Sequence, residues 1–154
     1  MTKSLLFIAH APSDNTRRIR DAALEGLRDP AIEGVDIVVK APPETVTADV
    51  LLADAVLLQT TENIGYMGGL TKDFFDRCYN DLLGQKEGMP VATLIRAGLD
   101  GTGTKRALAG IYSGLGWRPI AELTVLHGGW DEGFIDIARD TGMALAAGVE
   151  AGVF

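Results

Sequence analysis

Three segments rich in glycine or in small polar residues have the greatest potential for chemistry in this chain. They are His10 to Asn15, Thr60 to Leu70 and Arg96 to Gly103. Hydroxyl, amide and backbone N–H groups in such segments hydrogen-bond ligands, and glycine lets the backbone approach a ligand closely. No cluster of Cys and His has the spacing of metal ligands, so no metal site is expected. We therefore take these segments as candidate ligand-binding loops.

The first segment leads into an expected helix, where unpaired N–H groups and the helix dipole favour a phosphate. Ser13, Asn15 and Thr16 add hydroxyl and amide groups there. A helix cap formed by Ser13 or Asp14 would select the same residue types. Phosphate binding and capping therefore both remain open for this segment.

The second segment is the most informative, because it follows residues 55–59, an apolar run of strand length. Three glycines remove side chains where the chain must turn or lie against a flat ligand. They are Gly65, Gly68 and Gly69, and the polar residues beside them are Thr60, Thr61 and Asn63. A long mobile loop without a ligand is the alternative. The position after a buried strand favours ligand binding.

The third segment begins with an arginine and continues with several glycines. Arg96 can offset the negative charge of a phosphorylated ligand, although a surface ion pair is the commoner role of such an arginine.

Five apolar segments of strand length alternate with five segments of helix length. The expected strands are 5–9, 35–40, 55–59, 91–95 and 120–126, and the expected helices are 16–28, 47–53, 71–83, 104–115 and 134–149. This alternation predicts an α/β fold, a three-layer sandwich with a five-stranded parallel sheet of order 2-1-3-4-5. In that order the three candidate loops meet at the carboxyl edge of the sheet.

Length and composition predict one domain covering residues 1–154. The net charge of -7, from 14 basic and 21 acidic residues, argues against binding to nucleic acid or to an anionic membrane. The single Cys78 cannot form an internal disulfide, which fits a cytoplasmic protein. The apolar run 5–9 is too short for the core of a signal peptide or a membrane span.

The three segments together resemble the flavodoxin superfamily. They are most similar to its FMN-dependent NAD(P)H oxidoreductases and tryptophan-repressor-binding-protein-type quinone reductases. The most specific match covers residues 53–77, which contain Gly65-Tyr66-Met67 and Lys72-Asp73-Phe74-Phe75-Asp76-Arg77. Residues 10–17 resemble the FMN-phosphate loop of that family, and 138–142 its closing pattern.

The chain departs from the family pattern at a few positions. Ala11 stands where a hydroxyl is usual and Asp14 where glycine is usual. A carboxylate beside a phosphate is unfavourable unless it turns outward or pairs with Arg17 or Arg18. In the second segment, three residues replace the usual proline and aromatics: Thr61, Asn63 and Ile64.

The resemblance implies FMN as the cofactor and assigns site residues by position. The phosphate would be held by the first segment, through His10, Ser13, Asn15 and Thr16. The flavin ring would be lined by Thr60, Thr61, Glu62, Asn63, Ile64, Gly65, Tyr66 and Met67. The far side of the ring would be closed by Arg96, Ala97, Gly98 and Gly101.

The implied activity is electron transfer from NAD(P)H through FMN to a quinone-like acceptor, by an enzyme that is a monomer or a homodimer. Two alternatives remain open. One is a flavodoxin-type electron carrier without NAD(P)H turnover, which would dock a basic partner through its acidic surface. The other, suggested by Ala11 and Asp14, is a flavodoxin-fold protein that has lost FMN.

Overall fold

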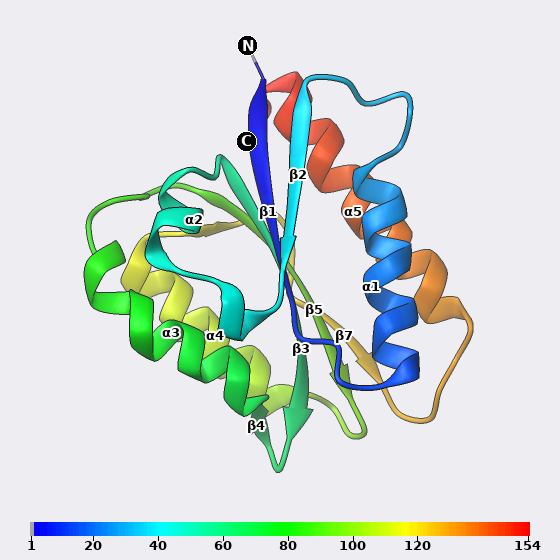
Figure 1. Ribbon diagram of the computed structural model, residues 1–154. Coiled ribbons are helices and arrows are strands. Elements are labelled where there is room, and N and C mark those ends of the chain that lie inside the picture. The colour runs from blue at the N-terminus through cyan, green and yellow to red at the C-terminus, as the bar shows by residue number, and fades with distance from the viewer. Residues whose placement is uncertain (1) are drawn as a thin grey trace.

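The computed structural model describes residues 2–154 and has three layers, with one twisted sheet between two layers of helices (Figure 1). The sheet contains β1 (Lys3–Ala9), β2 (Val35–Lys40), β3 (Ala55–Asn63), β4 (Tyr66–Met67), β5 (Pro90–Ala97), β6 (Arg118–Pro119) and β7 (Thr124–His127). The helices are α1 (Asp14–Leu27), the 3-10 turn η1 (Pro42–Glu44), α2 (Thr47–Leu51), α3 (Gly69–Leu82), α4 (Thr102–Leu115) and α5 (Gly133–Ala151).

The strand order is β2-β1-β3-β5-β6, and the pairs along it are parallel. β7 also pairs with β5, so β6 and β7 together occupy the place of the expected fifth strand. The predicted order 2-1-3-4-5 is therefore confirmed. The carboxyl ends of β1, β3 and β5 lie side by side at one edge of the sheet.

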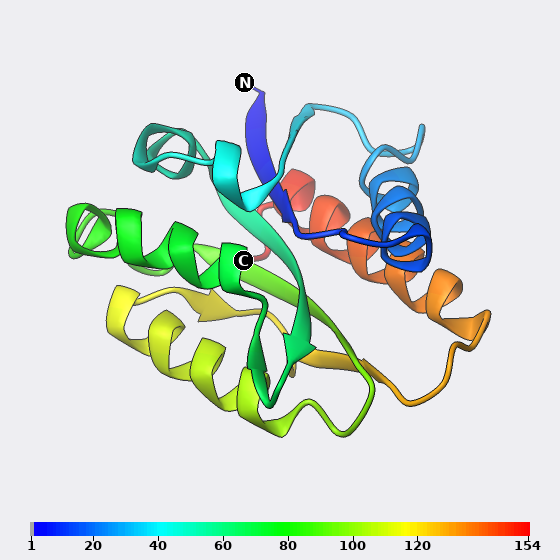
Figure 2. The ribbon, with the colours of Figure 1, turned by 60° about the horizontal axis from the view of Figure 1, so that its bottom comes forward.

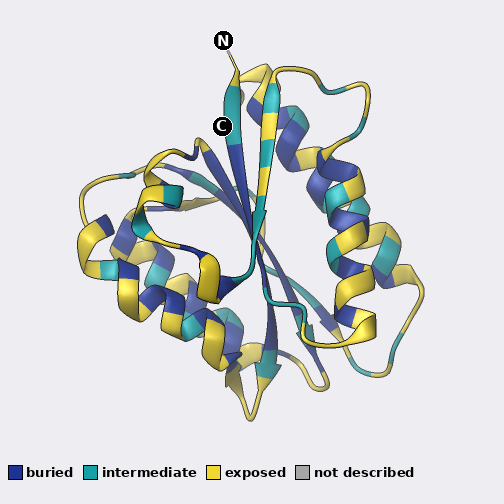
Figure 3. Cartoon of the chain, in the orientation of Figure 1, coloured by how far each residue is buried: buried dark blue, intermediate teal, exposed yellow. Residues whose placement is uncertain are grey.

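The central strands are buried along most of their length (Figure 3), and their side chains divide between two hydrophobic cores. Leu5 and Phe7 of β1 pack against α1 and α5, whereas Leu6 and Ile8 pack toward α2, α3 and α4. Burial on both faces explains why this strand is uniformly apolar in sequence. Figure 2 shows the two helical layers on either side of the sheet.

Helices α1 and α5 pack closely because two glycines face the partner helix. A Cβ on Gly26 would lie 2.0 Å from the carbonyl oxygen of Arg139, and one on Gly142 would lie 2.2 Å from that of Ala23. Neither position has room for a side chain. This contact fixes α1, whose first turn lies at the carboxyl edge of the sheet.

Two expectations about element boundaries were wrong. The expected loop at residues 60–70 begins as strand, because β3 runs to Asn63 and returns as β4 in an antiparallel hairpin. Thr60 and Thr61 are β-branched and continue the pairing with β5, opposite Ile95 and Arg96.

The expected strand 120–126 is split into β6 and β7, which pair with opposite ends of β5. Residues 120–123 form the irregular connection between them. Within residues 2–154, no helix is both long and apolar enough to cross a membrane. The same part of the chain gathers no set of three or more His, Cys, Asp or Glu side chains suited to a metal ion.

Candidate functional site

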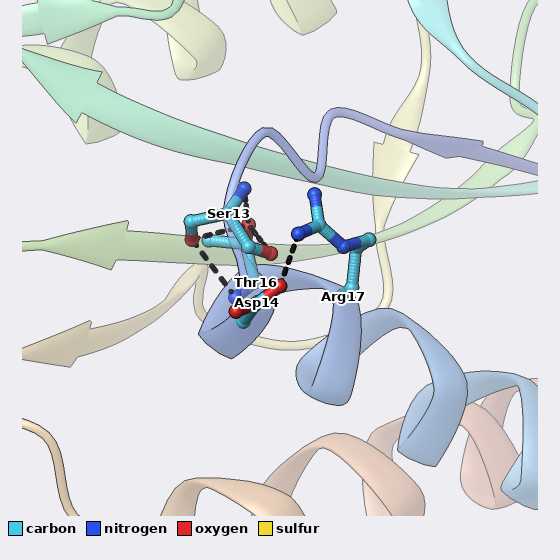
Figure 4. Close-up of polar contacts among 4 residues, drawn as sticks. All are labelled: Ser13, Asp14, Thr16 and Arg17. Carbon is cyan, nitrogen blue, oxygen red and sulfur yellow. Dashed lines mark hydrogen bonds and ion pairs between the residues drawn. The ribbon is translucent and has the colours of Figure 1, made fainter.

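The first turn of α1 lies directly behind the carboxyl end of β1, and Ser13 caps it (Figure 4). The N–H of Thr16 donates to Oγ of Ser13 over 3.2 Å, and the N–H of Ser13 donates to Oγ1 of Thr16 over 2.8 Å. The capping interpretation is thus confirmed for Ser13. The next two N–H groups, of Asp14 and Asn15, have no intrahelical acceptor. Within residues 2–154 no other acceptor reaches them.

The carboxylate of Asp14 points away from the loop and pairs with the guanidinium of Arg17 (Figure 4). Its side chain is 96% exposed. The carboxylate therefore both turns outward and pairs with an arginine, and these are the two conditions under which an acid is tolerated beside a phosphate. The N-terminus of α1 remains suited to an anion.

The second segment is a hairpin that packs against the third segment. Its turn residues Ile64 and Gly65 have φ of 52° and 75°. A Cβ on Gly103 would lie 1.9 Å from the carbonyl oxygen of Gly65, so the turn rests on the first turn of α4. Oε2 of Glu62 accepts the N–H of Thr104 over 3.1 Å. The role of Glu62 as a cap of α4 was not predicted from the sequence.

The residues expected to line a ring differ in their access to solvent. Thr60 and Met67 are buried, and Oγ1 of Thr60 lies 2.7 Å from Oγ1 of Thr71 in α3. Asn63, Ile64 and Tyr66 are exposed. The first pair packs in the interior, and the second group forms the exposed surface of the hairpin.

Arg96 makes contacts that the sequence did not predict, and its expected role toward a phosphorylated ligand stays a prediction. It lies within β5, and its Nη1 donates to the carbonyl oxygens of Ala97 and Leu126. Its guanidinium also lies 5.2 Å from the ring centre of Phe134. Arg96 therefore anchors the ends of β5 and β7 on the α5 side, and it forms no ion pair with any residue of 2–154. Beyond it, Ala97 is buried, Gly98 is exposed, and Gly101 has a φ of 70° where a Cβ would collide with Val125.

The first segment and the start of α1 contact β3 and the second segment. The N–H of His10 donates to the carbonyl oxygen of Gln59, and Nε2 of Gln59 donates to the carbonyl oxygen of Thr16. The His10 ring packs on Gly68, where an added Cβ would lie 2.8 Å from Cδ2 of His10 and 3.1 Å from Oγ1 of Thr61. Partial burial lowers the pKa of His10, so the imidazole is neutral at pH 7.

Three buried side-chain oxygens at this edge of the sheet have no hydrogen-bond partner within residues 2–154. They are Oε1 of Gln59, Oγ1 of Thr61 and Oγ1 of Thr104. Buried polar atoms are normally paired, and an unpaired one commonly marks a position that a ligand or water satisfies. Gln59 and Thr104 were not among the residues predicted for the site.

The same edge exposes large apolar side chains. Ile64 and Tyr66 on the hairpin and Leu99 after β5 all face solvent. Exposed apolar side chains gathered beside polar groups are typical of ligand-binding surfaces. The edge thus combines a helix N-terminus suited to an anion, oxygens without a partner among residues 2–154, and exposed apolar side chains.

Comparisons with known proteins agree with this architecture. No protein-family model matches the chain. A flavodoxin of Aquifex aeolicus (strain VF5) is 29% identical over 109 residues, which are 71% of this chain and 58% of that protein. The chain thus matches little more than half the length of this relative.

Two solved structures are similar over nearly their whole length. A flavodoxin, WrbA-like protein from Agrobacterium tumefaciens has a TM-score of 0.78 at 16% identity, covering 98% of this chain and 99% of that one. A flavodoxin from the domain Archaea has a TM-score of 0.76 at 15% identity, covering 97% and 99%. With the strand order, these similarities show that the chain has the flavodoxin fold.

Proposed function

We propose that this chain binds FMN at the carboxyl edge of its sheet and transfers electrons, as a protein of the flavodoxin type. The observation that carries the proposal is the set of unpaired groups at that edge: two helix N–H groups and three buried oxygens. Such a set suits a ligand that has a phosphate at one end and several hydroxyl and carbonyl groups along its length. FMN has this pattern.

The first segment would hold the phosphate. The N–H groups of Asp14 and Asn15 and the hydroxyls of Ser13 and Thr16 lie at the first turn of α1. Two features weaken this loop: Pro12 has no N–H, and Ala11 has no hydroxyl. The ion pair of Arg17 with Asp14 reduces the repulsion that the carboxylate exerts on a phosphate.

The second and third segments would hold the ring. Ile64, Tyr66 and Leu99 supply apolar contact, and Tyr66 has the flat face needed for stacking. Oγ1 of Thr61 and Oε1 of Gln59 are free for the polar groups of the ligand. FMN, when bound, supplies the electron-transfer chemistry, and the chain orients the ring and limits its contact with water.

Absorption spectroscopy of the purified protein during an FMN titration tests this proposal. We expect a flavin band that shifts on binding, quenching of flavin fluorescence, and saturation in the micromolar range. A protein that leaves the spectrum and fluorescence of FMN unchanged over that range would contradict it.

We propose further that NAD(P)H supplies the electrons and that a quinone-like molecule in the cytoplasm accepts them. The similarity of the fold to that of a WrbA-like protein supports this choice. The net charge of -7 favours the second candidate, a carrier that docks a basic redox partner. NAD(P)H oxidation by the FMN-loaded protein separates the two. Rapid turnover supports the enzyme, whereas FMN binding without turnover, with salt-sensitive electron transfer to a protein partner, supports the carrier.

A further inference from the structure

A cavity of about 240 Å³ lies on the far side of the first segment, toward the outer strand β2. We call it the proline cavity. Its walls are the inner side of residues 9–12, residues 41–43 and Leu70, with Arg20 of α1 at its margin. It shares His10 and Pro12 with the first segment, so it adjoins the proposed FMN site.

Arg20 is the charged side chain of the proline cavity. Among residues 2–154 no carboxylate lines the cavity, and His10, its other titratable group, is neutral at pH 7. Nε of Arg20 donates to the exposed carboxylate of Asp21 over 3.0 Å. Within residues 2–154, the two terminal nitrogens of Arg20 have no hydrogen-bond partner. They are free to bind an anion, and an arginine presents them in a geometry that matches a phosphate.

The remaining walls are apolar and rigid. Pro12, Pro43 and Leu70 are exposed, and proline rings offer flat surfaces at little cost in conformational entropy. Sites for a whole drug-sized ligand usually measure about 300–1,000 Å³. The proline cavity is smaller and suits a single ring system with its sugar. Its chemistry therefore fits a flat heterocycle that carries a phosphate.

We propose that the proline cavity binds the adenosine-phosphate half of a pyridine dinucleotide. This inference rests on the proposed function, since the other half must reach the flavin. The cavity lies beside β1 and β2, and the proposed ring site lies beside β3 and β5. The two are separated by about two strand spacings, on the order of 10 Å. The pyrophosphate and ribose that link the halves of a dinucleotide can span this distance.

Calorimetric titration with 2′,5′-ADP tests this inference, because that nucleotide lacks the nicotinamide and has no redox activity. We expect saturable binding to both the FMN-free and the FMN-loaded protein. Arg20→Ala should weaken binding about tenfold or more, as expected for loss of a charged hydrogen bond. Ala41→Phe, which places a ring in the cavity without changing any charge, should weaken it as well. Arg28→Ala, at the opposite end of α1, is the matched control and should leave it unchanged.

Three results would overturn the inference: no saturable binding of 2′,5′-ADP, equally tight binding of inorganic phosphate, or unchanged binding by Arg20→Ala. Competition between FMN and 2′,5′-ADP would also overturn it, because the cavity would then belong to the flavin site. FMN affinity, measured on the same samples, distinguishes failure of the proposed FMN site from failure of the proposed nucleotide site. A protein that binds FMN but not 2′,5′-ADP refutes this inference alone, and the reverse result refutes the proposed flavin site.

Discussion

Asp14 is the acidic residue in the first turn of α1, and its ion pair with Arg17 reduces but does not abolish its repulsion of a phosphate. Asp14→Asn removes its charge with little change of shape. We expect FMN to bind about fivefold more tightly, a gain of about 1 kcal/mol from relieved repulsion. We also expect the free energy of unfolding to fall by about 0.3–1 kcal/mol, because an acid in the first turn of α1 interacts favourably with the helix dipole. FMN titration and urea unfolding measure the two effects.

Asp136→Asn is a matched control, because Asp136 also lies in the first turn of a helix and pairs with an arginine three residues later. It should lower stability by a similar amount without changing FMN affinity. FMN binding to Asp14→Asn that is equal to or weaker than wild type would show that the phosphate does not lie at this helix terminus.

His10 makes the stability of the protein depend on pH. Burial lowers its pKa in the folded state below the usual 6.5, so the unfolded chain binds the proton more readily. Its contribution to stability is therefore complete above about pH 6.5 and is lost as the pH falls through the folded-state pKa. His10→Gln should flatten the pH dependence of the free energy of unfolding in this acidic range. Urea unfolding at a series of pH values measures this, and an identical slope for the variant would refute the assignment.

At the scale of elements, replacing a glycine between α1 and α5 by alanine should lower stability, although helix propensity alone predicts a gain. Alanine normally stabilises a helix interior relative to glycine by about 0.5–1 kcal/mol. Gly110→Ala in α4 should show this gain, because no atom lies within 4 Å of the added Cβ. Gly142→Ala should instead lower stability by about 1–3 kcal/mol, because its Cβ would collide with the backbone of Ala23.

Thermal or urea unfolding of the two variants side by side measures this difference. Because Gly142 lies on the face between the helices, Gly142→Ala should also weaken FMN binding if the displaced α1 carries its first turn with it. Equal stabilisation by both substitutions would mean that the close packing of α1 on α5 is absent in solution.

The sequence predicted the parallel sheet well, because uniformly apolar strands such as 5–9 alternate with amphipathic helices. It did not predict the hairpin of β3 and β4. Two-residue hairpin turns of this kind usually contain asparagine or glycine, whereas the first turn position here is Ile64, a β-branched residue at a φ of 52°. The glycines and polar residues around it suggested a loop instead. A strained, fully exposed isoleucine at the candidate site is itself consistent with a functional role.

At the scale of the whole molecule, the fold joins polar groups that the sequence keeps far apart. Ser13 and Asn15 were predicted from a local pattern, the start of a helix. Gln59 and Thr104 were not, because each is an ordinary strand or helix residue until the fold buries its oxygen without a partner. The contacts of Arg96 with the carbonyl oxygens of Ala97 and Leu126 were not predicted for a similar reason: its position in the chain does not reveal which face of β5 it occupies.

The central claim is that FMN binds across the ends of β1, β3 and β5. The most direct test is a two-dimensional NMR titration that follows backbone amide shifts as FMN is added. We predict that the amides of Asp14, Asn15, Thr61 and Leu99 shift together and saturate at one FMN per chain. The amides of Lys3 and Gly152, at the opposite edge of the sheet, should not move. No saturable shift, or the largest shifts at Lys3 and Gly152, would contradict the account.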